Sequence, residues 1–487
     1  MVSVVSSSTL NAQRSMGFKK TLWLIIIISI IGLSIASGMI RICYSLPWYD
    51  EVYFADITHN LIVNNTLTLN MLLTPIDASI YGPVYFYTQK VIASFLGFGM
   101  WQFRLLNFTS GIALIVMFLA LAKRLKFSKL NICILIALIA FDPRFNFNMT
   151  SGRMDLFALA LFMGGWLIFM NSERRTYFLI IVSGIISSFS FLTTPRIGFY
   201  FLVYILMFII EFIKSKERNK TFIKYLVFGL SVSIPVLIWI FYSYGHLSGY
   251  FKIIFNNPSI ANHFGGSIFP LKYQIPLIIL WFISGVYLFK SKVNFLNPLL
   301  TALFTIPLLH LVFIKEVGPY SAMMMPFIYL GIIIGVNSFP VRKVSFIPGV
   351  IALYMFLFFM SSSSNNIASL EVMKTASFDT FFRSQGIINK NVLADFPYYY
   401  SITKNDNRFI SFYNTKNELT ENKLNNNIEF AIITKENFNK NVDLFKKLGF
   451  KVISGYNSKN SNGFFYRVAI HLKKNIRTGY DGFVLKR

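Results

Sequence analysis

Long apolar stretches, each roughly 16 to 20 residues in length, recur along the chain and are separated by polar connections. About 20 helical residues are needed to cross the hydrocarbon core of a bilayer, because an α-helix rises only about 1.5 Å per residue. The pattern therefore predicts an α-helical polytopic membrane protein with about 11 spans. The expected spans are residues 21–40, 105–122, 130–143, 155–170, 177–192, 197–213, 223–243, 274–289, 296–313, 320–338 and 344–360.

The polar connections alternate in charge. Every second connection is rich in Lys and Arg, and together with the first residues of the chain these connections hold 18 basic residues, against 9 in the other, longer loops. Basic residues accumulate on the cytoplasmic side of membrane proteins, so we expect a cytoplasmic tail at residues 1–20 and a large outer loop at residues 41–104. The apolar run 21–40 exceeds the core of a cleaved signal peptide, which is the alternative interpretation of this segment.

The formal net charge of +26 is consistent with this topology. In a soluble chain such a charge would indicate nucleic-acid binding, but here the basic residues lie between apolar runs and report orientation instead. We therefore expect membrane lipids, and no nucleic acid, as partners. The two cysteines, Cys43 and Cys133, are expected near opposite faces of the membrane, so neither a disulfide nor a cysteine metal site is predicted.

The composition changes sharply after the last expected span. We take residues 21–360 as the membrane domain and residues 361–487 as a linker followed by a polar, Asn- and Lys-rich domain. An odd number of spans places this domain on the outer side of the membrane. Its β-prone runs, which alternate with helical stretches such as residues 436–448, predict a small extracytoplasmic α/β domain. These runs are residues 391–396, 408–413, 428–434, 450–456 and 464–472.

The first candidate for chemistry is the carboxylate pair Asp50 and Glu51, directly after the first apolar run. A carboxylate near a bilayer surface is costly to desolvate, and aromatic residues flank the pair on both sides. We interpret the pair as a reaction centre within an aromatic interfacial belt; an ordinary acidic loop is the alternative. The flanking aromatic residues are Tyr44, Trp48, Tyr49, Tyr53 and Phe54.

Further charges are expected at the same outer depth. Arg153 lies just before the fourth expected span, and Asp155 is its first residue. Arg104 lies just before the second span, and Arg196 lies at the start of the sixth span. Guanidinium groups bind phosphate oxygens through paired hydrogen bonds, so this set suits a phosphate-bearing ligand. A surface ion pair between Arg153 and Asp155 is the alternative. Motifs for nucleotide hydrolysis, zinc proteolysis and serine hydrolysis do not occur in the sequence.

The order of these features resembles the GT-C class of polytopic glycosyltransferases, specifically the superfamily of protein O-mannosyltransferases and lipid A aminoarabinose transferases. The resemblance covers roughly residues 22–360. It rests on the carboxylate pair after the first span and on several motifs that follow in the same order. These are Gly82-Pro83-Val84-Tyr85 at the Pro-rich segment of the family, Arg104, Pro143, the Arg153 and Asp155 pair, and Thr194-Pro195-Arg196.

The resemblance implies a membrane enzyme of a bacterial or archaeal plasma membrane that moves a sugar from a polyprenyl-phosphate carrier to a lipid, glycan or protein. Asp50 would be the catalytic carboxylate, with Glu51 and Asp155 as second choices. The sequence departs from the aminoarabinose transferases at Tyr81, where they have a Lys that contacts the carrier phosphate, and at Tyr53, where they have an Arg. The cations are then Arg153, Arg196 and Arg104, the last of them at the start of the second span.

In this scheme Asp50 removes the proton of the acceptor hydroxyl as that hydroxyl attacks the anomeric carbon, and a single displacement inverts the configuration. The cations stabilise the departing phosphate. The scheme needs no metal ion and no cofactor. A flippase or transporter of lipid-linked glycans is the alternative function, although such a protein is expected to carry charges inside its spans.

Overall fold

The structure, a computed structural model, describes most of the membrane domain and of the C-terminal domain. The described residues are 7–172, 177–256, 274–290, 297–314, 320–338, 353–354, 357–358, 375–420, 427–457, 467 and 480–487. The expected linker after residue 360, and most of the expected span 344–360, lie outside these residues.

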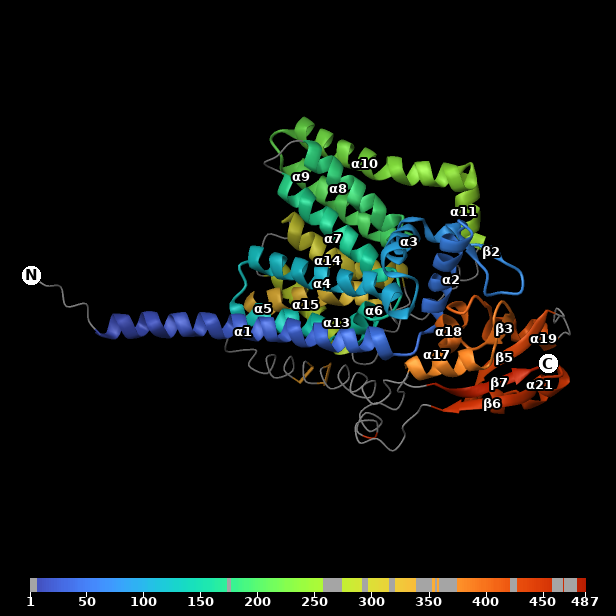
Figure 1. Cartoon of the computed structure of the whole chain (residues 1–487). Coiled ribbons are helices and arrows are strands. Elements are labelled where there is room, and N and C mark those ends of the chain that lie inside the picture. Colours follow the sequence, from blue (N-terminus) through green and yellow to red (C-terminus); the bar gives the residue numbers. More distant parts are fainter. Residues whose placement is uncertain are drawn as a thin grey trace, which may run out of the picture.

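A bundle of helices forms the larger part of the protein, and its long helices run in broadly the same direction (Figure 1). Helix α7 packs between α4 and α8, α8 packs against α10, and α13 packs against α15. The helices of the bundle are α1 (Ser7–Tyr44), α4 (Met100–Arg124), α5 (Lys129–Phe141), α6 (Pro143–Met149), α7 (Asp155–Asn171), α8 (Tyr177–Phe191), α9 (Leu202–Lys214), α10 (Arg218–Tyr244), α13 (Ile275–Lys290), α14 (Pro298–Leu309) and α15 (Ser321–Ser338).

The helix boundaries follow from local chemistry. The side chain of Ser128 accepts a hydrogen bond from the backbone N–H of Asn131 and so caps α5. Asp142 ends α5 and caps α6, because its Oδ1 atom accepts the backbone N–H groups of Arg144 and Phe145 at 2.9 and 2.7 Å. Pro143 then occupies the first turn, where its missing N–H costs nothing. The expected span 130–143 therefore corresponds to α5, and α6 continues from its end at a bend of 61°.

The described helices coincide with the expected spans from 21–40 to 320–338, but they differ in length. On their own, α1, α4, the continuous helix of residues 195–214 and α10 are long and apolar enough to cross a bilayer, and the bent pair α5 and α6 would be a fifth. Helices α7 and α8, with 17 and 15 residues, are shorter than the roughly 20 residues of a typical crossing. The polytopic helical fold is thus observed, whereas the count of about 11 spans stays a prediction.

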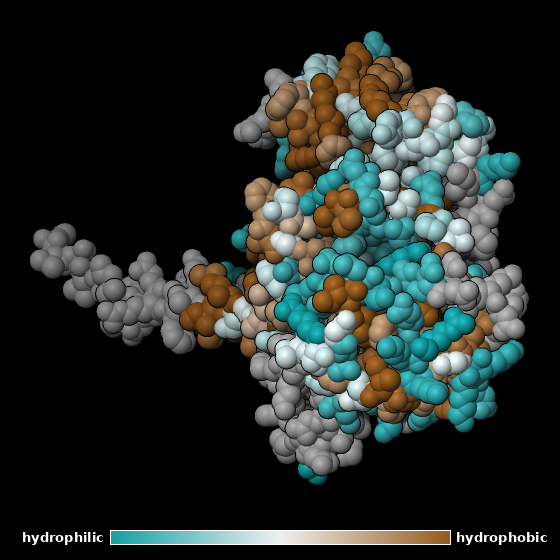
Figure 2. Space-filling view, turned by 45° about the vertical axis from the view of Figure 1, so that its right-hand side comes forward, coloured by the Kyte–Doolittle hydropathy of each residue, from teal (hydrophilic) through white to brown (hydrophobic). Residues whose placement is uncertain are grey.

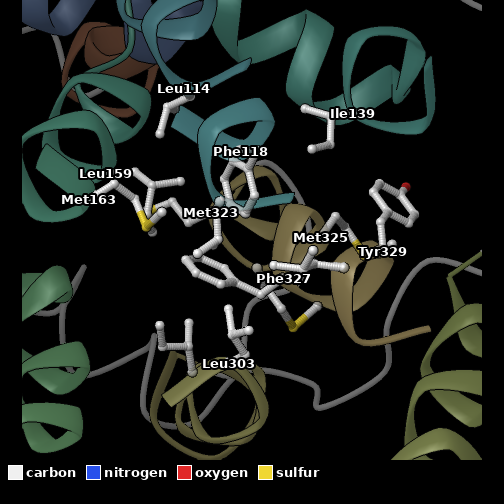
Figure 3. Packing of buried hydrophobic residues seen from close by; sticks show 14 of the residues in the cluster. Leu114, Phe118, Ile139, Leu159, Met163, Leu303, Met323, Met325, Phe327 and Tyr329 are labelled. Atoms are coloured by element: carbon white, nitrogen blue, oxygen red, sulfur yellow. The ribbon is translucent and has the colours of Figure 1, made fainter. Parts of the chain in front are cut away.

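The interior of the bundle is apolar and closely packed. Figure 3 shows Met163, Phe118 and Leu303 from three different helices around Met323 and Phe327 of α15. The methionine run that begins at Met323 is fully buried in this cluster, so it serves packing.

The outside of the bundle is also apolar, particularly along α10. Figure 2 shows hydrophobic surface over the part of the bundle that contains α10 and hydrophilic surface over the C-terminal domain. Apolar side chains that a water-soluble fold would bury are exposed along α10, as expected of a helix that faces lipid. They are Phe222, Ile223, Leu226, Leu230, Ile234, Leu237, Ile238, Phe241 and Tyr242.

One end of the bundle carries the elements of the first loop, 41–104. They are α2 (Tyr49–Val63), the two-stranded sheet of β1 (Thr68–Leu69) and β2 (Ile76–Asp77), the short 3-10 helix η1 (Ser79–Tyr81) and α3 (Val84–Leu96). Figure 1 places α2, α3 and α11 (Leu247–Asn256) together at this end.

The C-terminal domain is an α/β fold, as predicted. The five strands among its described residues are hydrogen-bonded in the order β4-β3-β5-β7-β6, with β3 parallel to both β4 and β5, and β7 antiparallel to β5 and β6. The strand β7 was not predicted, and the predicted strand 464–472 lies almost entirely outside the described residues. The elements are α17 (Thr375–Ser384), β3 (Asn391–Ala394), η6 (Phe396–Tyr398), α18 (Tyr399–Thr403), β4 (Arg408–Ser411), α19 (Phe412–Thr420), β5 (Ile428–Thr434), α20 (Lys435–Lys440), α21 (Val442–Lys447), β6 (Lys451–Asn457) and β7 (Asp481–Lys486).

This domain packs directly on the first loop. The backbone N–H of Ser411 donates to the carbonyl of Met71 at 2.9 Å, and the guanidinium of Arg408 donates to the carbonyl of Leu72 at 3.0 Å. A shared apolar cluster joins residues of α2 and α3 to Tyr399 and Phe409. The C-terminal domain and the first loop therefore lie at the same end of the bundle, on one side of any membrane that the bundle crosses.

Candidate active site

The first turn of α2 presents the two candidate carboxylates in different directions. Successive residues of an α-helix are about 100° apart around its axis, so neighbours in sequence do not share a face. The Glu51 side chain points inward and is 1% exposed, whereas the Asp50 side chain remains 20% exposed. Asp50 is therefore the member of the pair that an incoming molecule can reach.

Glu51 forms a paired salt bridge with Arg104. The Nε and Nη2 atoms of Arg104 donate to the two carboxylate oxygens at 2.7 and 3.0 Å, and both side chains are 1% exposed. The Nη1 atom of Arg104 donates to the carbonyls of Ile42 and Ser45, and the hydroxyl of Tyr400 donates to Glu51 at 3.2 Å. The pair thus ties α1, α2, α4 and the C-terminal domain together. Arg104 was expected to face the phosphate, but the structure directs its guanidinium to Glu51.

Asp50 belongs to a second cluster, centred on Arg153. The Nη1 atom of Arg153 forms an ion pair with Asp50, and its Nε atom donates to Asp155 at 2.8 Å. Arg153 is 1% exposed and Asp155 is fully buried, so the alternative of a surface ion pair does not hold and the two residues pair in the interior. The Oδ1 atom of Asp155 accepts no hydrogen bond from the described residues.

Aromatic rings hold the cations of this cluster. The guanidinium carbon of Arg153 lies 5.4 Å from the ring centre of Trp48 and 4.9 Å from that of Tyr320, and that of Arg196 lies 4.3 Å from Tyr320. Tyr320 therefore contacts two guanidinium groups and keeps both at one depth. Sequence reasoning did not identify Tyr320, because a tyrosine that precedes an apolar run carries no distinctive signal.

The sequence Gly82-Pro83-Val84-Tyr85 positions both sides of the cluster. Gly82 has φ +77°, and an added Cβ would lie 2.2 Å from the carbonyl oxygen of Leu192, so only glycine fits there. This close approach lets the Val84 N–H donate to the same carbonyl at 3.2 Å, which brings Tyr81 beside the Arg196 segment. The Tyr85 hydroxyl donates to the carbonyl of Gly152 at 3.1 Å and so anchors the loop that carries Arg153.

The electrostatics follow from burial and neighbouring charge. Burial raises the pKa of Asp50 above its ordinary value, and the adjacent Arg153 acts in the opposite direction. Burial alone would lower the pKa of Arg153, but the carboxylates of Asp155 and Asp50 hold it well above the usual value. Burial also raises the pKa of Tyr81, against the effect of Arg196. Arg153 is therefore a permanent cation, whereas Asp50 is able to take up a proton.

Two other carboxylates of this region have structural roles. The Oδ2 atom of Asp142 accepts the hydroxyl of Tyr329 at 2.6 Å, and its Oδ1 atom caps α6, so both oxygens are occupied. Asp56 accepts the backbone N–H groups of Asn70 and Met71 at 2.6 and 3.0 Å and thereby fixes the segment on which the C-terminal domain packs.

The expected aromatic belt is divided among three environments. Trp48 covers Arg153, and Phe54 is buried against Tyr81. Tyr49 and Tyr53 lie against Phe396 of the C-terminal domain, at ring-centre distances of 6.3 and 6.4 Å. These two tyrosines thus contact the C-terminal domain, which the expectation of a membrane interface did not anticipate.

An apolar groove is lined in part by η3, the 3-10 helix that carries Arg196. Its volume is about 650 Å³, and it runs between η3 (Pro195–Phe201), α9 and α10. Gly198, two residues after Arg196 in η3, lies in its lining, as does Phe191 at the end of α8. Within the described residues, no three His, Cys, Asp or Glu side chains are gathered in a way that would hold a metal ion.

The chain has the fold of the GT-C class of glycosyltransferases, as the resemblance in its sequence implied. A solved structure of ArnT from Cupriavidus metallidurans in the apo state aligns over 96% of this chain and 98% of its own, with a TM-score of 0.52 and 12% sequence identity. ArnT bound to undecaprenyl phosphate aligns over the same shares, with a TM-score of 0.51 and 12% identity. No family model and no curated protein matches the chain by sequence.

Proposed function

We propose that this protein is an integral membrane glycosyltransferase that moves a sugar from a polyprenyl-phosphate donor to a lipid, glycan or protein acceptor. The observation that carries the proposal is the Arg153 cluster: a partly exposed carboxylate, Asp50, is held by a buried cation in the same site as Arg196 and Tyr81. A base and a phosphate-binding cation are the two groups that such a transfer requires.

Arg196 is the principal phosphate-binding residue in this proposal. It is half-buried beside Tyr320, and the apolar groove that begins at Gly198 offers a place for the polyprenyl chain. ArnT with a similar fold binds undecaprenyl phosphate, which supports a donor of this chemistry. Tyr81 contributes a hydroxyl on the side of the first loop, where the family has a lysine.

Asp50 is the base. The acceptor oxygen attacks the anomeric carbon, the bond from that carbon to the phosphate oxygen breaks with its electrons going to the phosphate, and the acceptor proton passes to Asp50. The single displacement inverts the configuration. Arg153 orients Asp50, and with Arg196 it supplies preorganised positive charge for the departing phosphate. The buried salt bridge between Glu51 and Arg104 stabilises the first turn of α2, and Asp155 holds Arg153 in place.

The transfer takes place at the extracytoplasmic face of a bacterial or archaeal plasma membrane, with the N-terminus in the cytoplasm. The excess of basic residues in the alternate connections supports this orientation. Packing of the C-terminal domain on the first loop is consistent with it, because both then lie outside.

The decisive experiment compares wild type with Asp50→Asn in nanodiscs. Radiolabelled polyprenyl-phosphate sugars serve as donors, and a membrane glycolipid extract serves as acceptor. We expect the variant to bind the donor as wild type does and to lose sugar transfer by about 10²–10⁴-fold. Full transfer by Asp50→Asn would refute the assignment. In a parallel assay in sealed proteoliposomes, movement of the labelled donor across the bilayer without transfer would identify a flippase instead.

A further inference from the structure

Four aromatic side chains from two separate parts of the chain gather next to Asp50. Tyr49 and Tyr53 come from α2, Phe396 follows β3, and Tyr413 lies on α19. The ring centre of Phe396 is 6.3 Å from that of Tyr49, 6.4 Å from that of Tyr53 and 5.9 Å from that of Tyr413. Phe396 thus joins the other three rings into one group, which we call the aromatic platform.

Two rings of the platform are open to solvent. Tyr413 is 73% exposed and Tyr49 is 42% exposed, so an incoming molecule can reach both rings. They lie at the junction of the two domains, where the C-terminal domain meets the first loop. Exposed rings gathered at a junction beside a reactive carboxylate indicate a binding surface.

The platform borders Asp50 directly. Tyr49 precedes Asp50 in α2, and Tyr53 lies one helical turn after Tyr49. Burial, with smaller contributions from Tyr81, Asp50 and Tyr413, raises the pKa of the Tyr53 hydroxyl to about 12, and the Asn414 side chain acts in the opposite direction. The Tyr53 hydroxyl is therefore un-ionised, and both Asp50 and Tyr413 are near enough to influence its pKa.

The platform is chemically different from the phosphate side of the site. The guanidinium groups of Arg153 and Arg196 stack on other rings, those of Trp48 and Tyr320. The platform itself consists of neutral rings with tyrosine hydroxyls at their edges. Flat aromatic faces suit the C–H faces of pyranose rings, and tyrosine hydroxyls exchange hydrogen bonds with sugar hydroxyls.

We propose that Tyr49, Tyr53, Phe396 and Tyr413 bind the sugar rings of a carbohydrate acceptor and place one of its hydroxyls at Asp50. The proposal rests on the proposed function and names the acceptor class within it. The hydroxyl oxygen forms the new bond to the anomeric carbon of the donor, its proton goes to Asp50, and the polyprenyl phosphate leaves with the bonding electrons. An anionic head group would require cations, and none of the four platform side chains carries a positive charge.

The test measures binding of neutral trisaccharides to the full-length protein in nanodiscs. Maltotriose, mannotriose and tri-N-acetylchitotriose are titrated by saturation-transfer NMR, and radiolabelled undecaprenyl phosphate is measured separately. The variants are Tyr413→Ala, which removes an exposed ring, and Tyr413→Trp, which retains one. Phe95→Ala is the matched control, since Phe95 is 83% exposed but belongs to α3 and lies outside the platform.

We expect at least one trisaccharide to bind wild type through its C–H groups. Affinity falls about twofold to tenfold in Tyr413→Ala, as loss of one aromatic contact predicts, and is retained in Tyr413→Trp and Phe95→Ala. Binding of undecaprenyl phosphate is the same in all four proteins. If the protein binds that lipid but none of the trisaccharides, the proposal that the platform binds sugar is wrong and the proposed function still stands.

Other outcomes are equally decisive. Wild type that binds neither the trisaccharides nor undecaprenyl phosphate contradicts the proposed function itself. A neutral Ser-containing tripeptide that binds in place of the sugars, and loses affinity in Tyr413→Ala, overturns the carbohydrate assignment in favour of a peptide acceptor. Equal affinity of Tyr413→Ala and wild type for a bound trisaccharide shows that the sugars bind elsewhere.

Discussion

The hydroxyl of Tyr400 donates to the Oε1 atom of Glu51 at 3.2 Å, although 349 positions separate the two residues. Glu51 is the immediate neighbour of Asp50, and Tyr400 belongs to the C-terminal domain. The hydrogen bond therefore links the position of this domain to the helical turn that carries the proposed base. The C-terminal domain is thus a structural part of the site.

Tyr400→Phe tests this link. The substitution removes one hydrogen bond and keeps the ring in its buried place, so we expect a loss of about 0.5–1.5 kcal/mol in stability. Thermal unfolding of the purified protein in detergent measures it. Tyr413→Phe, which alters an exposed hydroxyl, is the control and is expected to unfold as wild type does.

Arg104→Met tests the buried salt bridge between Glu51 and Arg104. It leaves the Glu51 carboxylate buried without its cation, and loss of one partner of a buried pair typically costs about 3–5 kcal/mol. We expect a large fall in the melting temperature and in the yield of folded protein. The double variant Glu51→Leu with Arg104→Met removes both charges and should recover much of the stability. A direct role of Arg104 in phosphate binding predicts instead a folded protein with weak donor affinity.

Arg196→Ala tests the phosphate contact. Hydrogen bonds to a charged group contribute about 1.5–3 kcal/mol, so affinity for undecaprenyl phosphate should fall about 10- to 100-fold. Arg196→Lys should also be impaired, because an ammonium does not reproduce the planar fork of a guanidinium. Lys252→Ala is the control, since Lys252 is an exposed cation on α11 at the same end of the bundle. Unchanged affinity in Arg196→Ala would exclude this residue from the phosphate site.

The pH dependence of transfer tests Asp50 as the base. A base acts only when ionised, and burial raises the pKa of Asp50, so kcat should fall as pH decreases through a value above the ordinary aspartate pKa of about 3.9. Arg153 lowers this pKa, so Arg153→Gln should move the acidic limb of the profile to higher pH in addition to lowering the rate. A limb that moves to lower pH in the variant would contradict the arrangement.

The buried carboxyl group of Asp56 should make the stability of the protein depend on pH. Burial raises its pKa to about 7, against the backbone hydrogen bonds from Asn70 and Met71, whereas an unfolded aspartate titrates at about 3.9. Between these values the folded protein binds more protons than the unfolded chain, so the contribution of Asp56 to the free energy of unfolding decreases as pH rises from about 4 to about 7. Asp56→Asn removes this component. Melting temperatures of both proteins across this range measure it, and parallel curves would contradict the raised pKa.

Much of the architecture follows from the sequence. Apolar runs long enough for helices, with polar residues between them, establish the helical membrane bundle, because unpaired backbone groups are too costly in lipid. Alternation in the C-terminal residues likewise predicts four of its five strands, from residues 391–396 to 450–456. The position of Asp50, Arg153 and Asp155 near the ends of apolar runs was also sufficient to predict that they belong to one polar region, because charges avoid the hydrocarbon core.

Only the tertiary structure decided how these charges pair. Arg104 and Arg153 were equivalent candidates in sequence, yet one is bound by Glu51 and the other by Asp50 and Asp155. Helical periodicity places a side chain on a face, but a partner 53 or 103 positions away is set by how helices pack. Tyr320 and Phe396 could not be predicted as parts of the site for the same reason. Their contribution depends on which distant residues pack beside them, and local sequence does not encode that packing.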